Sequence, residues 1–245
     1  MKFFADDILK PFISANRYVT ICEIGASYGE NTDKILELPE VRFTLIDPCL
    51  DMDLTAKYQR QARVTVRKGT SLGELPLLEG AFDCFLIDGD HNWYTVYNEI
   101  GTIHTRELLR KGGTAFFHDV GWPYGRRDMY FRPEVLPPEH VLPSEKKGVI
   151  PGVSALAESG GFNPQFLTAS HEGGPRNGVL TAVEDFVRKH ADEYAFFWYN
   201  EENGLGVLFR KNGLSRERLS FEWLRLKLKT LQALKKIKRS MPRAR

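Results

Sequence analysis

The 245-residue sequence predicts a doubly wound α/β fold, in which helices cover both faces of a mostly parallel, seven-stranded sheet. Short apolar runs rich in β-forming residues alternate with helical segments over the first half of the chain, which indicates repeated strand–helix–strand units. A hairpin signal near residue 203 adds two antiparallel strands at the end of this pattern. Sheets of this kind have right-handed crossovers and bind ligands at the carboxyl ends of their strands.

Five apolar runs are typical of strands buried on both faces of a sheet. They are residues 17–25, 41–48, 63–69, 82–89 and 113–120. Of the connectors, 30–38 has helical composition, 51–62 could hold a helix, and 70–81 is short and less clear. The clearest helix falls within residues 92–111, where Asn92 can cap the start and Gly112 lies where a C-terminal cap belongs.

The pattern changes after residue 120. Eight of the 13 prolines fall within residues 121–180, so we expect an irregular insertion over residues 121–177. Residues 178–190 have the pattern of an amphipathic helix, and residues 194–211 predict two strands around an Asn203-Gly204 turn. We therefore expect one domain over residues 1–210 and a tail over residues 211–245.

Composition and charge exclude several classes of protein. With 42% hydrophobic and 27% charged residues, and no apolar stretch of roughly 20 residues, the sequence is typical of a soluble globular protein. The start, MKFFADDILK, has two aspartates where a signal peptide needs an apolar core, so we expect a cytoplasmic protein. None of the three cysteines forms a CxxC pair, which favours free thiols.

The charge is distributed unevenly along the chain. Residues 211–245 hold 12 Lys or Arg against two Glu, a net charge of +10. Because the whole chain carries +2, residues 1–210 carry about −8. The net negative charge of residues 1–210, called the body below, argues against a nucleic-acid partner, since phosphate contacts need a clustered positive face.

The turn after the first predicted strand combines small residues with an acid. The stretch EIGASYG, residues 23–29, contains two glycines, which let backbone approach a ligand closely because glycine has no Cβ; an ordinary tight turn is the alternative. Asp47 ends the second strand 18 residues after Gly29, near the roughly 20-residue spacing at which nucleotide-binding α/β folds place a carboxylate on ribose hydroxyls. The dinucleotide pattern GxGxxG is incomplete, which disfavours a dehydrogenase.

These motifs resemble those of class I S-adenosylmethionine-dependent methyltransferases. EIGASYG is similar to the first motif of that family, LIDP (residues 45–48) to its second, and the terminal hairpin to its last two strands. FLIDGDHNWYTVYNEI (residues 85–100) and GGTAFFHDV (residues 112–120) resemble the small-molecule group that includes macrocin O-methyltransferase. The resemblance covers residues 17–120 and 178–210, and it implies a Rossmann-like methyltransferase fold.

The resemblance also implies a binding site for S-adenosylmethionine. The candidate cofactor-binding residues are Glu23, Gly25, Ser27, Gly29, Asp47, Thr70, Ser71 and Asp88. By that resemblance Glu23, Gly25 and Gly29 lie around the methionine part of the cofactor, and Asp47 holds the ribose. Thr70 and Ser71 stand where the family often has an acidic residue near the adenine.

The ends of the fourth and fifth strands supply groups for proton transfer or metal binding. A sulfonium methyl group is already activated, so the enzyme must mainly align the acceptor and remove one proton. Asp88 and His91 are the candidate catalytic residues. Asp88, His118 and Asp119 are candidate ligands for Mg²⁺ or Mn²⁺, as in metal-dependent members of the resembling group, and such an ion could lower the pKa of an acceptor hydroxyl. Helix capping by Asp88 and packing or loop-stabilising roles for the others are the structural alternatives.

We therefore expect an O-methyltransferase, assisted by a divalent metal, that acts on a hydroxyl of a sugar, a glycan or a glycosylated small molecule. Aromatic and arginine side chains at the start of the insertion suit an acceptor-binding lid, although they could instead form loop core. They are Trp122, Tyr124, Arg126, Arg127, Tyr130 and Phe131. A metal-independent or N- or C-directed methyltransferase, and a non-catalytic cofactor-binding scaffold, are the alternatives.

The tail has the pattern of a basic amphipathic helix. Its apolar residues at helical spacing are Phe221, Leu224, Leu228, Leu231, Leu234 and Ile237. Such a helix could pack on its own domain or on a dimer partner, or it could lie on an anionic membrane surface. We favour packing.

Overall fold

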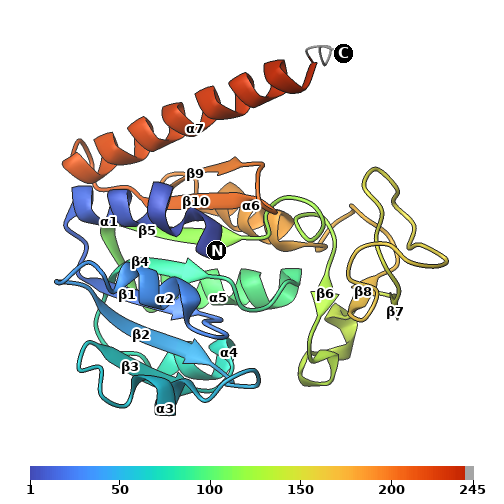
Figure 1. The fold of residues 1–245 in the computed structure, drawn as a ribbon, viewed down its shortest axis with the longest axis horizontal. Coiled ribbons are helices and arrows are strands. Elements are labelled where there is room, and N and C mark those ends of the chain that lie inside the picture. The colour runs from blue at the N-terminus through green and yellow to red at the C-terminus, as the bar shows by residue number, and fades with distance from the viewer. Residues whose placement is uncertain (241–245) are drawn as a thin grey trace, which may run out of the picture.

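The computed structural model describes the backbone of residues 1–240 and the side chains of residues 1–235, so the predicted contribution of Ile237 lies outside the described residues. A seven-stranded sheet forms the centre, in the order β3-β2-β1-β4-β5-β10-β9 (Figure 1). The strands are β1 Thr20–Ile24, β2 Arg42–Asp47, β3 Val64–Lys68, β4 Phe82–Ile87, β5 Leu109–His118, β9 Tyr194–Tyr199 and β10 Leu205–Arg210. β1 to β5 pair in parallel and β10 is antiparallel to both its neighbours, which confirms the predicted fold class.

Helices cover both faces of this sheet because successive strand side chains point in opposite directions. In β4, Cys84 and Leu86 join one core cluster, and Phe85 and Ile87 join the other. The first face carries α1 Lys10–Asn16, α2 Glu30–Ile35, α3 Leu54–Tyr58 and part of α7 Arg216–Ser240. The second face carries α4 Ser71–Glu74, α5 Trp93–Thr105 and α6 Val179–Lys189. The described helices include none that is both long and apolar enough to cross a membrane.

Helix α5 begins as the sequence predicts but ends earlier. The Asn92 side chain accepts a hydrogen bond from the Thr95 amide at 2.8 Å, as an N-cap should. The predicted C-terminal cap at Gly112 is wrong. Glu107 takes the left-handed conformation (φ 54°) and the Leu108 amide bonds to the Ile103 carbonyl, so the helix closes without a glycine. Gly112 instead lies inside β5, where a Cβ would approach the Asn212 side chain to 2.3 Å.

The insertion contains a small antiparallel sheet beside the carboxyl ends of the central strands (Figure 1). Its strands are β6 Met129–Tyr130, β7 Ser144–Lys146 and β8 Leu167–Ala169, in the order β6-β8-β7. Arg127 is 1% exposed and donates to the carbonyls of Ser154 and Ala169 at 2.6 and 2.7 Å. Asp128 accepts from the amides of Trp93 and Gly178, at 2.7 and 2.6 Å, which ties the insertion to the starts of α5 and α6.

The N-terminal segment, for which the sequence predicted no element, is helical and packs on the first face. A short 3-10 turn (Lys2–Phe4) and a π-helical turn (Ala5–Leu9) lead into α1. Phe4, Leu9 and Phe12 are buried in the same core cluster as residues of α2 and α7. The segment also brings Met1 to the carboxyl end of β4, because the Met1 amino group lies 2.5 Å from the Asp88 carboxylate.

Candidate functional site

A cavity of about 790 Å³ opens at the carboxyl ends of β1, β2, β4 and β5. Its volume lies within the roughly 300–1,000 Å³ typical of small-molecule sites. Seven of the eight candidate cofactor residues line it, namely Glu23, Gly25, Ser27, Asp47, Thr70, Ser71 and Asp88. The candidate base His91 and the candidate metal ligands His118 and Asp119 line the same cavity. Gly29 is not among the lining residues.

The two glycines of the first turn are required by neighbouring protein atoms. Gly25 has φ +80°, and a Cβ there would lie 2.3 Å from the Cα of Gly89, so the turns after β1 and β4 pass directly against each other. Gly29 has φ +74°, and a Cβ there would lie 2.2 Å from the Tyr58 hydroxyl. The ordinary-turn explanation therefore accounts for Gly29, whereas Gly25 lets two strand ends share one wall of the cavity.

Asp47 connects the turns after β1 and β2. Its Oδ2 accepts a hydrogen bond from the Ser27 amide at 2.9 Å, and its Oδ1 accepts one from the Cys49 amide at 2.6 Å. An ionised carboxylate offers about four lone-pair sites, so each oxygen can still accept a hydrogen bond from a ligand hydroxyl. Asp47 is therefore held in one orientation at the wall of the cavity.

Glu23 lies beneath the first turn and fixes it to α2. It accepts hydrogen bonds from the Asn31 amide group at 2.8 Å and from the Thr32 hydroxyl at 2.5 Å. Burial raises the pKa of Glu23 to about 7, although both of these hydrogen bonds oppose the rise. The side chain thus holds the start of α2 against the end of β1, which sets the shape of the turn between them.

His118, at the end of β5, lies between two carboxylates. Its Nδ1 is 3.1 Å from Asp88 and 2.8 Å from Asp119, and its Nε2 is 3.0 Å from the Glu202 carbonyl. Burial disfavours the charged ring, but the charge of Asp88 and the hydrogen bonds to both carboxylates outweigh it and raise the pKa of His118 to about 10. Both ring nitrogens face acceptors, so the arrangement suits an imidazolium ion.

The same three side chains could hold a divalent cation. Their candidate ligand atoms all lie within 4.8 Å of one another. Two carboxylate oxygens and one imidazole nitrogen form a donor set that suits Mn²⁺ or a similar ion. Coordination requires a neutral imidazole, so binding would release the proton that His118 carries. The Asp88, His118 and Asp119 side chains therefore fit a metal ion in donor type and in spacing.

His91, directly after β4, forms a pair with Asp119. Its Nε2 lies 2.7 Å from Asp119 Oδ2, the oxygen that also bonds to His118, while its buried Nδ1 has no hydrogen-bond partner. Burial lowers the pKa of the ring, but the charge and hydrogen bond of Asp119 outweigh it, and the pKa of His91 is raised. With Nε2–H donated to Asp119, the neutral ring carries its lone pair on Nδ1. Asp119 thus orients the ring as a carboxylate orients a general base, and a proton can reach Nδ1 only after a local movement uncovers it.

The insertion contributes part of the wall next to His91. Phe131 is 48% exposed, lines the cavity, and has its ring centroid 5.6 Å from that of His91. Tyr124, Arg127 and Tyr130 are buried, so the loop-core alternative is correct for these three. The sequence did not indicate the other lining residues of this region, which are Arg132, Val135 and Leu136, nor those of the N-terminal segment, which are Met1, Lys2 and Phe3. They reach the cavity through tertiary packing and carry no local motif.

Comparison with known proteins agrees with this architecture. Residues 22–120 match the family described as Methyltransferase domain. The fold is similar to that of the SAH-bound methyltransferase PaMTH1 of Podospora anserina, at 16% identity and a TM-score of 0.51 over 82% of this chain and 76% of that one. It is also similar to an O-methyltransferase family protein from Burkholderia thailandensis, at 14% identity and a TM-score of 0.53 over 87% of this chain and 56% of that one. No curated protein matches the chain in sequence.

Proposed function

We propose that the chain, whose residues 22–120 match a methyltransferase domain, is a class I S-adenosylmethionine-dependent methyltransferase that transfers the methyl group to a hydroxyl oxygen of a sugar, a glycan or a glycosylated small molecule. The Burkholderia thailandensis protein of similar fold is described as an O-methyltransferase family member, which is consistent with an oxygen acceptor. The observation that carries the proposal is the His91–Asp119 pair at the cavity, because a hydroxyl must lose a proton when its oxygen is methylated.

The cofactor would lie along the ends of β1, β2 and β4. In this placement the turn at Gly25 and Ser27 borders the methionine part, Asp47 accepts hydrogen bonds from the ribose hydroxyls, and Thr70 and Ser71 border the adenine. Asp47 suits its role because a carboxylate accepts bonds from two adjacent hydroxyls, and both its oxygens are already fixed by backbone amides.

The acceptor would lie between the sulfonium methyl group and the wall formed by His91 and Phe131. The acceptor oxygen attacks the methyl carbon, the carbon–sulfur bond breaks, and S-adenosylhomocysteine leaves with the electron pair on sulfur. The hydroxyl proton moves to Nδ1 of His91 once binding of the acceptor has uncovered that buried atom, and Asp119 stabilises the resulting imidazolium. The ring of Phe131 offers an apolar face for a sugar, and Arg132 offers donors for its oxygens or for an anionic group.

Asp88, His118 and Asp119 would hold a divalent metal ion in the assisted form of this reaction. When bound, such an ion supplies a positive charge that lowers the pKa of the acceptor hydroxyl. Asp119 contacts both histidines, so it is shared between the proposed metal site and the proposed base. In the metal-independent alternative, His91 or Asp88 takes the proton without that help.

The function is tested by incubating the protein with S-adenosylmethionine labelled in the methyl group and with matched acceptor libraries of sugars, glycosides, phenols and amines. Mass spectrometry should locate the label on an oxygen of a glycoside or sugar, and His91→Ala should abolish most of the transfer. Label on nitrogen or carbon would replace the proposal with an N- or C-directed enzyme. Binding of S-adenosylhomocysteine with no transfer to any acceptor would favour the non-catalytic scaffold.

A further inference from the structure

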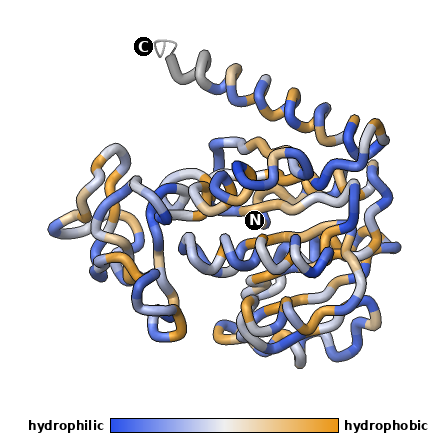
Figure 2. The backbone as a smooth tube through the Cα atoms, turned by 180° about the vertical axis from the view of Figure 1, so that it is seen from behind, coloured by the Kyte–Doolittle hydropathy of each residue, from blue (hydrophilic) through white to orange (hydrophobic). Residues whose placement is uncertain are grey.

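In residues 216–235 of α7, whose side chains the structure describes, one apolar face is covered by the protein and a second is exposed. Phe221, Leu224 and Leu228 are buried against the protein, as the sequence predicted for the packing interpretation. Leu231 and Leu234 of the same predicted stripe are exposed. Leu234 also belongs to a second stripe, whose other members, Leu219, Trp223 and Leu226, were not predicted from the sequence; the four side chains are 57–61% exposed. Figure 2 shows hydrophobic positions recurring between hydrophilic ones along this helix.

The second stripe is a continuous face of the helix. Its first three members are spaced by four and then three residues, so they lie within one narrow sector at 100° per residue. The same geometry places Arg216 and Lys227 along one side of the stripe, and Glu222 and then Lys229 along the other. Arg218 and Arg225 lie farther round that side, where Arg225 pairs with Glu222 at 2.7 Å. Lys227 directly adjoins the stripe, with Nζ 5.2 Å from the centroid of the Trp223 ring. The charges beside this apolar face are therefore mostly positive, a combination typical of helices that lie in a membrane interface.

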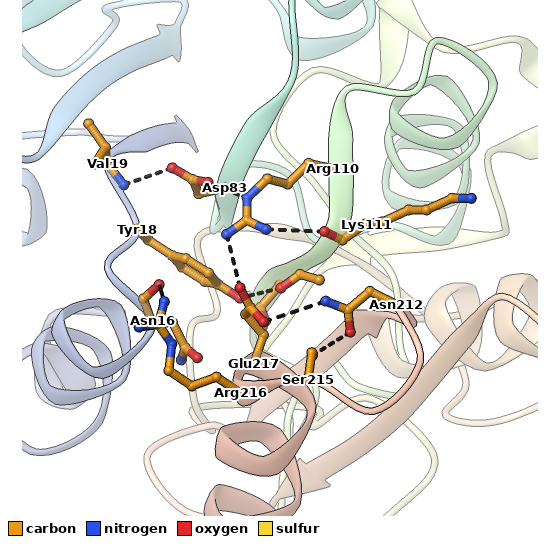
Figure 3. A network of polar contacts seen from close by, with 12 residues as sticks. Asn16, Tyr18, Val19, Asp83, Arg110, Lys111, Asn212, Ser215, Arg216 and Glu217 are labelled. Carbon is orange, nitrogen blue, oxygen red and sulfur yellow. Dashed lines mark hydrogen bonds and ion pairs between the residues drawn. The ribbon is translucent and has the colours of Figure 1, made fainter.

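The helix is held to the protein at both ends of its described part. At its start, Arg216 donates to the Asn16 carbonyl at 2.9 Å, and Glu217 lies 3.8 Å from Arg110, which also pairs with Asp83 (Figure 3). Farther along, Lys235 lies 3.3 Å from Glu201 in the turn between β9 and β10. The stripe is therefore presented in a formed helix, so docking does not have to fold it.

An apolar groove of about 480 Å³ adjoins the stripe. It runs between α1 and α7 and is lined by Ile8, Pro11 and Phe12 on one side and by Leu219, Trp223 and Leu224 on the other. The exposed apolar surface is thus wider than the stripe alone. Contiguous surface of this kind marks an interaction site more often than isolated exposed side chains do.

We propose that this face of α7 docks on an anionic lipid surface. Leu219, Trp223 and Leu226 would enter the interface, and the flanking Arg and Lys side chains would contact the lipid phosphates. The tail carries a net +10 on a body of about −8, so its charge complements anionic headgroups. Symmetric pairing of the stripe with a second copy would bring two mostly positive margins together, which disfavours a dimer through this face.

The test uses the full chain and sedimentation with vesicles of phosphatidylcholine alone or mixed with phosphatidylglycerol. Binding to the mixed vesicles only is expected, and it should weaken as salt rises because screening shortens the attraction to about 10 Å at 0.1 M. The double substitution Arg218→Gln and Lys229→Gln should weaken binding by about 30-fold, since each cation near such a surface contributes on the order of a factor of five. The double substitution Leu219→Ser and Trp223→Ser should abolish it.

Leu77→Ser is the matched control, because Leu77 is 60% exposed in the turn before β4 and lies far from α7 in sequence. It should bind the vesicles as the unmutated chain does. Melting curves should show that every variant is folded. Equal binding to neutral vesicles, no binding to anionic ones, or unchanged binding by the stripe variant would each overturn the proposal. Light scattering that shows a dimer in the unmutated chain and a monomer in the stripe variant would replace the lipid surface with a second copy.

Discussion

The carboxylate of Asp47 accepts a hydrogen bond from the backbone amide of Ser27, with 2.9 Å between Oδ2 and the amide nitrogen. Through this bond the end of β2 holds the turn that follows β1. The shape of the proposed cofactor site therefore depends on Asp47 before any ligand arrives.

Asp47→Ala should weaken the binding of S-adenosylhomocysteine by about 10- to 100-fold. The reason is the loss of hydrogen bonding between the ligand and a charged group, which we expect to contribute about 1.5–3 kcal/mol in total. Titration calorimetry measures the change. Asp53→Ala is the control, because Asp53 caps α3 through the Thr55 and Ala56 amides and does not line the cavity. Equal affinities of the Asp47 variant and the unmutated protein would remove Asp47 from the cofactor site.

His91→Gln should lower kcat by about 10²- to 10⁴-fold, the usual contribution of general base catalysis, while cofactor affinity stays within a few-fold. Gln keeps a donor for Asp119 but cannot accept the proton. The matched control His171→Gln changes an exposed histidine of the insertion and should leave the rate unchanged. A normal rate in the His91 variant would assign proton removal to another group.

Chelation should lower turnover on the order of 10- to 100-fold, because without a bound cation the pKa of the acceptor hydroxyl is no longer lowered. Added Mn²⁺ or Mg²⁺ should restore turnover. His118→Ala removes one of the three proposed ligands and should leave a rate that no longer responds to either treatment. Turnover assays with and without chelator measure both effects. A chelator-insensitive rate in the unmutated protein would favour proton removal by the His91–Asp119 pair alone.

Glu99→Gln should stabilise the protein at pH 8 and leave it nearly unchanged at pH 4. Glu99 is fully buried, and neither carboxylate oxygen has a hydrogen-bond partner of standard geometry. Burial raises its pKa from 4.5 to about 8, so between these values the unfolded chain loses a proton that the folded chain keeps, and stability falls as pH rises. Melting temperatures of both proteins from pH 4 to 9 test this. A constant difference across that range would contradict it.

Asp128→Ala should lower the free energy of unfolding by about 2–5 kcal/mol. The substitution leaves the buried amides of Trp93 and Gly178 without their acceptor, and each such loss costs about 1–3 kcal/mol. Urea denaturation measures the change. Asp192→Ala, at an exposed position, should stay within about 0.5 kcal/mol of the unmutated protein. A similarly small effect at Asp128 would show that the insertion is held by other contacts.

Local pattern was enough to predict the sheet, because strand and helix positions carry apolar residues at fixed spacing. The cap at Asn92 and the hairpin at Asn203-Gly204 followed from side-chain chemistry that acts within a few residues, and both positions have the expected conformation. The proximity of Asp88, His118 and Asp119 could also be predicted, because these residues follow or end the neighbouring parallel strands β4 and β5, whose carboxyl ends lie at the same edge of the sheet.

Other features depend on contacts that no local pattern records. Glu107 ends α5 in a conformation usually taken by glycine, so the position of Gly112 misplaced that end. The space that a Cβ would need at Gly29 is taken by Tyr58, a residue of a separate helix. In α7 the stripe that contains Phe221, Leu224 and Leu228 was predicted, and the stripe that contains Leu219, Trp223 and Leu226 was missed. Both have helical spacing, so only the packed structure shows which one is covered.

The separation of charge along the chain makes the molecule an electric dipole. The acidic body and the basic α7, which runs along one side of it in Figure 1, form the two poles. A surface potential exerts a torque on such a dipole and rotates it before contact, over a distance of about one Debye length, roughly 10 Å at 0.1 M salt. Near an anionic surface the basic pole turns toward that surface. First contact is therefore made by α7 more often than it would be if the molecule approached in random orientations. The charge distribution thus sets the orientation of the molecule before contact, and the apolar stripe contributes binding energy only after the molecule has turned.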